Sequence, residues 1–390
     1  MITGDLDRAL ATPISSAGTW RPAPLGTAGG PRTYATTVAF RLASGQPGGP
    51  AAVAARLAAR LRRLDWVETA AVTGGGYLVV TVTAGALARL AVRITQAGPG
   101  CARSSALAGT SLTRPAPADL ASARTWEEAR RRVHAAVTAR LAEAAGARLK
   151  QDDAERTAVP GSPAPVTAAS PVTPAFPATG ASPVAPSVVA APSVVAEAIA
   201  YAGADAITYA LARLPPGGPA QVDAHLAAAH HLGNPAYAVR YAHAHAASAL
   251  RQAADLGLDR GEAAQFQPRL LTHPSEQALL YELSWLPERV AGAARRVRPD
   301  VFVRYLEVLA RAYFDAQEAC PAAPPGMTVP GVSPGEQAAV PAATARLWLA
   351  AASRTALLTR LGLLGVSAPD RLSAGTDRPR PAGPAPAAGD

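Results

Sequence analysis

The chain is poor in several residue types, and each shortage excludes a class of protein. Two of its 390 residues are cysteine, Cys101 and Cys320, and they form no CxxC pair. This rules out a disulfide framework, so we expect a reducing, cytoplasmic location. No apolar run approaches the roughly 18 residues that a membrane-spanning helix needs. The N-terminal MITGDLDRAL is acidic where a signal peptide is basic, so we expect no export.

Aromatic residues and lysine are also scarce. Aromatics are 5% of the chain, whereas proline and glycine together number 70, which indicates long loops or linkers. Lys150 is the only lysine, so arginine supplies 36 of the 37 basic residues. Residues 1–150 hold 19 basic and 8 acidic side chains, a net +11, whereas residues 201–372 hold 15 and 14, a net +1. We therefore expect a polyanionic partner to be attracted mainly to the N-terminal part.

Apolar residues between positions 201 and 372 recur at steps of three and four, which predicts amphipathic helices. The four stripes are Val239, Ala242, Ala246, Leu250; Leu279, Leu280, Leu283, Leu286, Val290; Phe302, Tyr305, Leu306, Leu309, Tyr313; and Leu347, Leu357, Leu358, Leu361, Leu364. Asn234 and Pro235 are suited to start the first helix, and Gly365 and Pro369 to end the last. No strand-like alternation interrupts the pattern, which predicts a helical bundle.

The pattern of residues 1–97 predicts a small α+β module. We expect a short helix within residues 1–30, a helix from Arg32 with Tyr34, Val38 and Leu42 on one side, and a second helix over Ala51–Leu64. The β-branched runs WVETAAVT and GYLVVTVT then predict two strands. At this length the chain has room for two or three domains, each with its own core.

A proline-rich segment separates this module from the bundle. Thr157 to Ala196 contains nine prolines and no charged residue, so we expect an extended linker. Residues 98–156 include a further helical region, at 119–149, whereas Pro321–Ala343 is expected to be a loop and 373–390 a disordered tail. The predicted fold is multidomain and mainly α: an α+β N-terminal module, a proline-rich linker (157–196) and an all-α bundle (197–372).

Four blocks within the bundle segment also resemble a known family. They read NPAYAVRYAHAH, EQALLYELSWLPERVAGAA, RPDVFVRYLEVLARAYFDA and ARLWLAAASRTALLTRLGLLGVSAPDRL. In this order they resemble the C-terminal DALR anticodon-binding domain of arginyl-tRNA synthetases. The resemblance implies tRNA as partner. It assigns RNA contacts to Arg240, Tyr241 and His243, in and beside the family's YAHAR motif, where His245 replaces the usual Arg.

The N-terminal module resembles the additional N-terminal domain of the same family, which contacts the tRNA elbow. The likeness rests on TYATT at residues 33–37 and GGGYLV at residues 74–79. It implies RNA contacts by Tyr34 and Tyr77, and a tyrosine such as Tyr77 can stack on a base. Thr37 and Val79 stand where the family has amide side chains, so base-specific hydrogen bonds are not expected there.

Residues 119–149 resemble the family's first catalytic helix. Aligned without gaps, Thr125 and Glu128 take the positions of two ATP-binding histidines. A glutamate at a helix N-terminus repels the α-phosphate of ATP. The second ATP-binding element of the family, a KMSKS-type loop, needs more lysine than Lys150. The resemblance thus implies a pseudo-synthetase with no catalytic residues and no cofactor.

Five of the seven histidines lie between His225 and His245, which raises the question of a metal site. His243 and His245 are about 200° apart around a helix, so they cannot hold one ion together. We therefore expect no metal site and assign these histidines to polar contacts between helices.

Three runs of arginine are candidates for contacts with RNA phosphates. They are Arg56, Arg60, Arg62, Arg63; Arg130, Arg131, Arg132; and Arg295, Arg296, Arg298, with Arg289 and Arg304 near the last run. Each run has a plainer interpretation as a solvated helix face, and the third has Glu288 and Asp300 as partners nearby.

These patterns predict a non-catalytic protein that binds tRNA or a tRNA-like RNA. Two alternatives stay open. One is a scaffold that binds proteins and no RNA, and the other is retained tRNA charging, alone or with a catalytic subunit.

Overall fold

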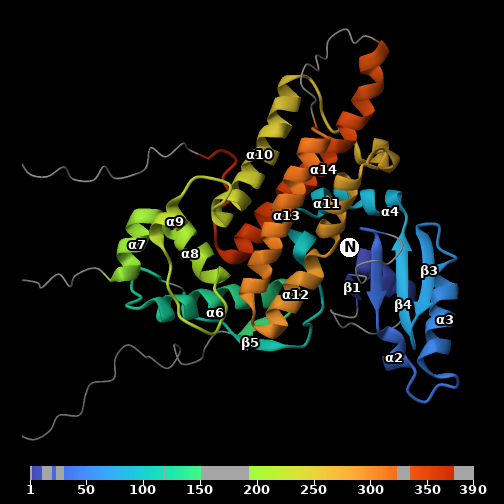
Figure 1. Cartoon of the computed structure of the whole chain (residues 1–390), viewed down its shortest axis with the longest axis horizontal. Coiled ribbons are helices and arrows are strands. Elements are labelled where there is room, and N and C mark those ends of the chain that lie inside the picture. The colour runs from blue at the N-terminus through green and yellow to red at the C-terminus, as the bar shows by residue number, and fades with distance from the viewer. Residues whose placement is uncertain are drawn as a thin grey trace, which may run out of the picture.

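The computed structural model describes residues 2–10, 20–22, 30–117, 119–150, 193–322 and 334–372. A small antiparallel sheet with its helices lies at one end of the molecule, and helices form the remainder (Figure 1). Most of the predicted linker and the predicted tail (373–390) lie outside the described residues. The last linker residues, from Ser193 to Ala196, cap and begin helix α7, so the linker prediction is wrong at that end.

The N-terminal module contains a four-stranded sheet in the order β1-β2-β4-β3, with antiparallel pairing throughout. Its elements are α1 (Ile2–Leu10), β1 (Trp20–Pro22), β2 (Thr33–Thr36), α2 (Val38–Leu42), α3 (Gly49–Leu61), β3 (Val67–Thr73) and β4 (Tyr77–Val82). The predicted α+β module, its second helix and its two strands are confirmed.

The helix expected from Arg32 is wrong in its first half. Residues Thr33–Thr36 form strand β2, which pairs with β1 on one side and β4 on the other, and helix α2 starts only at Val38. The aromatic and β-branched residues of TYAT suit a strand. Two neighbouring strands satisfy its backbone groups, and this pairing outweighs the helical spacing of Tyr34, Val38 and Leu42.

The segment after the sheet is not purely helical, which corrects the prediction for residues 98–156. It contains α4 (Ala84–Ala88), α5 (Leu90–Ala97), a 3₁₀ turn (Gly98–Ala102), β5 (Ser111–Thr113), α6 (Trp126–Ala144) and β6 (Arg148–Lys150). Strands β5 and β6 are parallel, with α6 as the connection between them. This strand–helix–strand unit is the building block of nucleotide-binding sheets.

The regular elements among the described residues of the bundle are all helices. Its helices are α7 (Val194–Ala202), α8 (Ala204–Arg213), α9 (Ala224–Ala228), α10 (Pro235–Asp255), α11 (Pro274–Ser284), α12 (Leu286–Arg296), α13 (Pro299–Ala319) and α14 (Pro334–Leu364), with 3₁₀ turns at Ala263–Gln265 and Pro268–Leu270. Asn234 caps α10 as predicted, its side chain accepting a hydrogen bond from the Ala236 N–H at 3.1 Å. The loop predicted over Pro321–Ala343 is wrong from Pro334 onward, where α14 begins.

Among the described residues no single helix is long and apolar enough to cross a membrane, although α7 and α8 together meet that length and composition across a bend of 117°.

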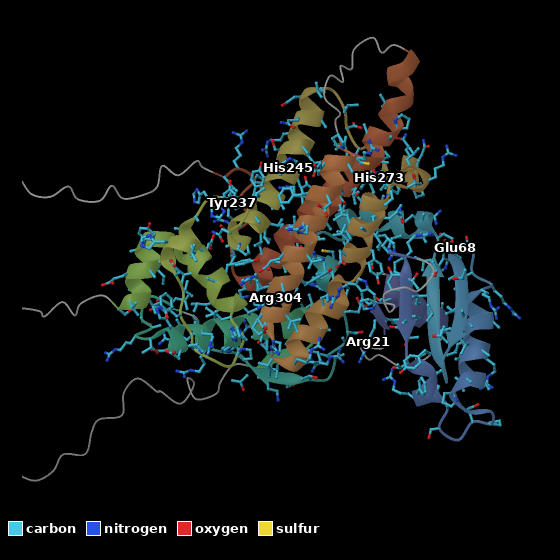
Figure 2. All side chains as sticks on the ribbon, viewed as in Figure 1. Arg21, Glu68, Tyr237, His245, His273 and Arg304 are labelled. Carbon is cyan, nitrogen blue, oxygen red and sulfur yellow. The ribbon has the colours of Figure 1, made fainter. Side chains whose placement is uncertain are left out.

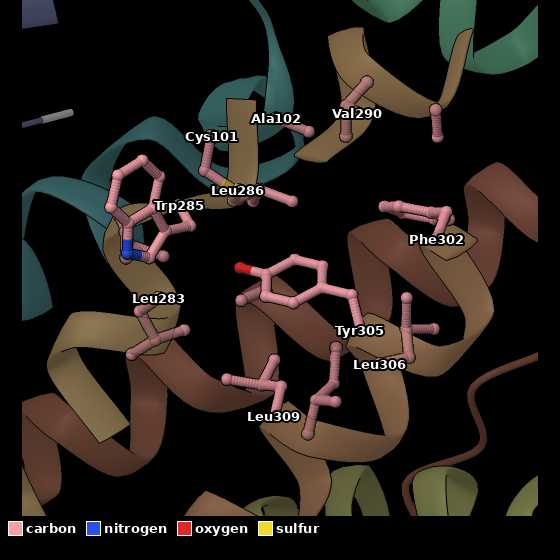
Figure 3. Close-up of a cluster of buried hydrophobic side chains, with 14 of the residues drawn as sticks. Cys101, Ala102, Leu283, Trp285, Leu286, Val290, Phe302, Tyr305, Leu306 and Leu309 are labelled. Atoms are coloured by element: carbon pink, nitrogen blue, oxygen red, sulfur yellow. The ribbon is translucent and has the colours of Figure 1, made fainter. Parts of the chain in front are cut away.

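One hydrophobic cluster extends from Ile2 to Val366, so the expected parts share a core instead of each having its own. The predicted stripe of α13 lies within it, and Figure 3 shows Tyr305 surrounded by apolar side chains. The guanidinium of Arg360 is fully buried beside that ring, 4.7 Å from its centroid, and donates a hydrogen bond to the Tyr305 hydroxyl at 3.0 Å. Burial lowers the pKa of Arg360.

The sheet docks on the bundle through a buried tyrosine. Tyr34 of β2 is fully buried, and its ring lies 5.2 Å from that of Trp285 and 5.5 Å from that of Tyr281. Its hydroxyl donates to the Ser284 Oγ at 2.8 Å, while the Tyr281 hydroxyl donates to the Thr33 carbonyl at 3.1 Å. Burial raises the pKa of Tyr34 well above its ordinary value. Tyr34 therefore has no exposed surface with which to make the predicted RNA contact.

The junction yields a stability prediction. Replacing Tyr34 with Phe removes one buried hydrogen bond and should lower the free energy of unfolding by about 1 kcal/mol, the typical net worth of such a bond. Denaturant unfolding of the full chain measures this change. Tyr77→Phe, at a tyrosine that is 48% exposed, is the matched control and should be neutral. Equal stabilities of the two variants would show that the bond adds nothing.

Candidate nucleic-acid interface

Helix α10 carries a row of aromatic side chains on one face. Tyr237, Tyr241 and His245 follow at intervals of four residues, which places them one above another on a helix. The rings of Tyr237 and Tyr241 are 5.7 Å apart and 10° from parallel, and His230 stacks on Tyr237 at 5.5 Å. Phe314 of α13 completes the set, 5.7 Å from Tyr241. We call these five residues the aromatic ladder. Figure 2 labels Tyr237 and His245 along α10.

Four of the five ladder residues line a cavity of about 1030 Å³, whereas Phe314 lines a different one. Arg251 and the segment Asp370–Leu372 contribute polar groups to its wall. Arg354 forms an ion pair with Asp370 at 2.9 Å, and Arg251 and Arg371 are the arginines of the cavity lining. Flat rings beside a few arginines are suited to hold unpaired nucleic-acid bases, because stacking binds the base and the cation binds its phosphate.

The two histidines of the predicted motif point to different partners, as their spacing indicated. His243 is fully buried and its Nδ1 lies 3.2 Å from the Pro369 carbonyl. The Nδ1 of His245 lies 2.9 Å from the Tyr313 hydroxyl. Burial lowers the pKa of both imidazoles, which favours their neutral forms. His243, predicted to contact RNA, is instead a core residue in this structure.

The other two residues of that motif have separate surroundings. Tyr241 belongs to the aromatic ladder. Arg240 is half-buried, with its Nη2 3.3 Å from the Ser367 Oγ and 3.7 Å from the Asp205 carboxylate. The sequence reasoning missed Tyr237, His230 and Phe314. The four-residue spacing of Tyr237, Tyr241 and His245 was visible in the sequence, whereas only the packing of α13 on α10 brings in Phe314.

Helix α3 presents the first arginine run to solvent. Arg56, Arg60, Arg62 and Arg63 are all exposed, and the first two make weak contacts with Gln46 and the Leu10 carbonyl. Tyr77 lies close by, because Gly76 approaches Pro50 at the start of α3 so closely that a Cβ would come within 2.6 Å. Tyr77 is exposed and meets Phe40 edge-on at 5.2 Å. Tyr77 thus lies near the first turn of α3, whereas Arg56–Arg63 follow from the middle of this helix to just past its end.

The arginine run of α6 does not share one face. Arg130 donates to the carbonyls of Pro215 and Gly218 at 3.1 and 3.0 Å. Arg132 pairs with Glu128 at 2.6 Å, whereas Arg131 is exposed. Successive helical residues lie about 100° apart, so three in a row point in three directions.

The N-terminus of α6 is capped by its own side chains. The Thr125 hydroxyl accepts from the Glu128 N–H at 3.2 Å, and the Glu128 carboxylate accepts from the Arg124 N–H at 3.0 Å. The pair differs from a capping box, in which the glutamate would accept from the N-cap residue Thr125 itself. The bond from Arg124 contributes most to the lowered pKa of Glu128, so its negative charge occupies the place where an anion would otherwise bind.

The third arginine run lies at the end of α12. Arg298 forms an ion pair with Asp300 at 2.7 Å. For this arginine the structure therefore favours pairing within the protein over a contact with RNA phosphate. Arg295 and Arg296 are exposed and line a cavity between α12 and strand β1.

A family match covers the part of the chain that carries most of the aromatic ladder. Residues 239–372 match the DALR anticodon binding domain. The match includes α10 from Val239 onward and all of α11 to α14. The predicted recognition of this domain, and of a mainly helical fold, is confirmed.

Arginine–tRNA ligases are similar to part of the chain. Arginine–tRNA ligase from Micrococcus luteus is 39% identical over 176 residues, covering 45% of this chain and 30% of that protein. The ligase from Paenarthrobacter aurescens is 38% identical with the same coverage. Arginyl-tRNA synthetase of Thermus thermophilus is a structural match at 28% identity and a TM-score of 0.31, over 43% of this chain and 26% of that one. The chain spans about 30% of the length of these ligases.

The aromatic ladder yields a binding prediction. Replacing Tyr237 and Tyr241 together with Leu keeps apolar bulk but removes the flat rings. Because stacking contributes about 1–3 kcal/mol per base, affinity for single-stranded RNA should fall at least about fivefold. Its salt dependence should stay the same, since no charge is removed.

Fluorescence anisotropy at several salt concentrations measures both quantities. Tyr201→Leu is the control, because Tyr201 is an exposed tyrosine of α7 that contacts His225 outside the ladder. Unchanged affinity in the double variant, with helix content intact, would rule out stacking by the ladder.

Proposed function

We propose that this chain binds tRNA, or RNA of similar shape, without charging it with an amino acid. The aromatic ladder carries the proposal, because it sets parallel rings beside arginines at a DALR anticodon binding domain. In this proposal the ladder holds unpaired bases of the anticodon loop, and the arginines of α3 hold the RNA backbone elsewhere.

We base the proposed absence of catalysis on particular residues of this chain. Thr125 and Glu128 stand where the resemblance places two ATP-binding histidines, and they cap α6 with a carboxylate. A fixed negative charge there opposes the triphosphate of ATP. The second ATP-binding element of the family needs a lysine-rich loop, whereas Lys150 is the only lysine of this chain.

The proposal predicts no arginine-dependent exchange between ATP and pyrophosphate by the full chain. Thr125→His with Glu128→His should not restore exchange, because a single lysine cannot supply the missing loop. Labelled pyrophosphate incorporation, with an active arginine–tRNA ligase as positive control, measures this. A rate clearly above the buffer blank would support the alternative in which charging is retained.

A second prediction concerns where the RNA backbone is held. Replacing Arg56, Arg60, Arg62 and Arg63 with Ala should weaken tRNA binding and flatten its salt dependence, by up to about one unit for each phosphate that is no longer neutralised. Replacing Arg295, Arg296 and Arg298 should flatten it less, because Arg298 is already paired with Asp300.

Binding titrations of both variants over a range of salt test this order. A slope unchanged by the α3 substitutions would make that helix face a solvated surface. Retention of proteins instead of tRNA, insensitive to nuclease, would favour the scaffold alternative.

A further inference from the structure

A positively charged cleft lies where the sheet meets the bundle. Its volume is about 680 Å³, and it lies between strand β1 and helix α12. Four arginines line it, Arg21 from β1 and Arg289, Arg295 and Arg296 from α12, with Glu288 as the acidic residue of its lining. We call it the arginine cleft. Figure 2 labels Arg21 at the boundary between the sheet and the bundle.

One face of α12 builds the cleft wall. Trp285, Arg289, Gly292 and Arg296 follow at steps of three or four residues, so they share that face. Gly292 makes room for the Arg296 head, because a Cβ at Gly292 would lie 3.1 Å from the Arg296 Nη2.

The end of α12 holds these arginines in place. Val297 has a φ of 51°, a conformation that β-branched residues rarely adopt. In this conformation the N–H groups of Val297 and Arg298 bond the carbonyls of Ala294 and Ala293, which closes the helix directly after Arg296.

The cleft offers a hydrogen-bond donor that lacks an acceptor among the described residues. The buried Nε of Arg289 has no hydrogen-bond partner there. A guanidinium group only donates hydrogen bonds, so this atom is suited to an acceptor that a ligand brings. No described acidic residue forms an ion pair with Arg21, Arg295 or Arg296 within 4 Å.

Glu288, the acidic residue of the cleft lining, repels an anion only weakly. Glu288 accepts a hydrogen bond from the Thr3 hydroxyl, and burial raises its pKa to about 7. Near neutral pH a large fraction of this side chain is therefore uncharged, while the four guanidinium groups stay positive. Arginine forks match the oxygens of a phosphate group and bind it through paired hydrogen bonds.

We propose that the arginine cleft binds a phosphate group, held by Arg21, Arg289, Arg295 and Arg296. The proposal that the site binds a phosphate group rests on the residues of the cleft alone. Assigning the phosphate to an RNA backbone that passes between sheet and bundle rests on the proposed function. A free phosphate compound is the other source.

The test uses inorganic pyrophosphate as the probe and the full chain as the protein. Calorimetric titration at constant ionic strength should show one saturable site in the wild type. Arg295→Gln with Arg296→Gln should weaken it at least tenfold. The matched control, Arg89→Gln with Arg148→Gln, removes the same charge from two exposed arginines outside the cleft and should bind like wild type.

Gly292→Ala is a milder variant that keeps every charge and favours the helix. It should weaken pyrophosphate binding by displacing the Arg296 head. No saturable binding by the wild type, or equal affinity of the cleft and control variants, overturns the proposal.

Competition with tRNA then identifies the source of the phosphate. Displacement of pyrophosphate by tRNA assigns the cleft to the RNA backbone, whereas simultaneous binding assigns it to a free phosphate compound. If the chain binds pyrophosphate but no tRNA, the phosphate site is supported and the proposed function is refuted.

Discussion

The docking of Tyr34 against Tyr281 and Trp285 is the contact on which the arrangement of the molecule depends. It joins a central strand of the sheet to the end of α11 and the start of α12. Because this contact is buried and hydrogen-bonded, the sheet cannot turn against the bundle without exposing aromatic surface and unpaired hydroxyl groups. The spacing between the α3 arginines, the arginine cleft and the aromatic ladder follows from this contact.

Whether an arginine of this protein is available to bind an anion depends on its ion-pair partners more than on its position in the chain. Arg298, Arg132 and Arg213 have carboxylate partners, and Arg360 is buried beside Tyr305. The α3 helix and the arginine cleft, by contrast, each present several exposed arginines together. Under the proposed function, this remaining charge is what attracts an RNA backbone, because a paired arginine contributes little net electrostatic field.

The unit formed by β5, α6 and β6 has the strand–helix–strand order that nucleotide-binding sheets use. Its helix packs on α12 and α8 in the shared core. Its N-terminus, the end at which such folds bind phosphates, is closed by Thr125 and Glu128. The phosphate-binding chemistry that we infer lies elsewhere, on α12 and β1, where the arginines are.

The sequence by itself determined four apolar stripes of the bundle helices, although not that Trp285 divides the second between α11 and α12, together with the strands β3 and β4, the cap at Asn234 and the DALR domain. Each of these depends on local spacing or on an ordered set of motifs. It did not determine that residues 33–36 form a strand, because strand pairing involves partners far along the chain. Nor did it reveal that Tyr34 and His243 are buried, or that Arg21 and Arg296 line one cleft. Burial and convergence of charge depend on which surfaces meet, and only the tertiary structure decided that.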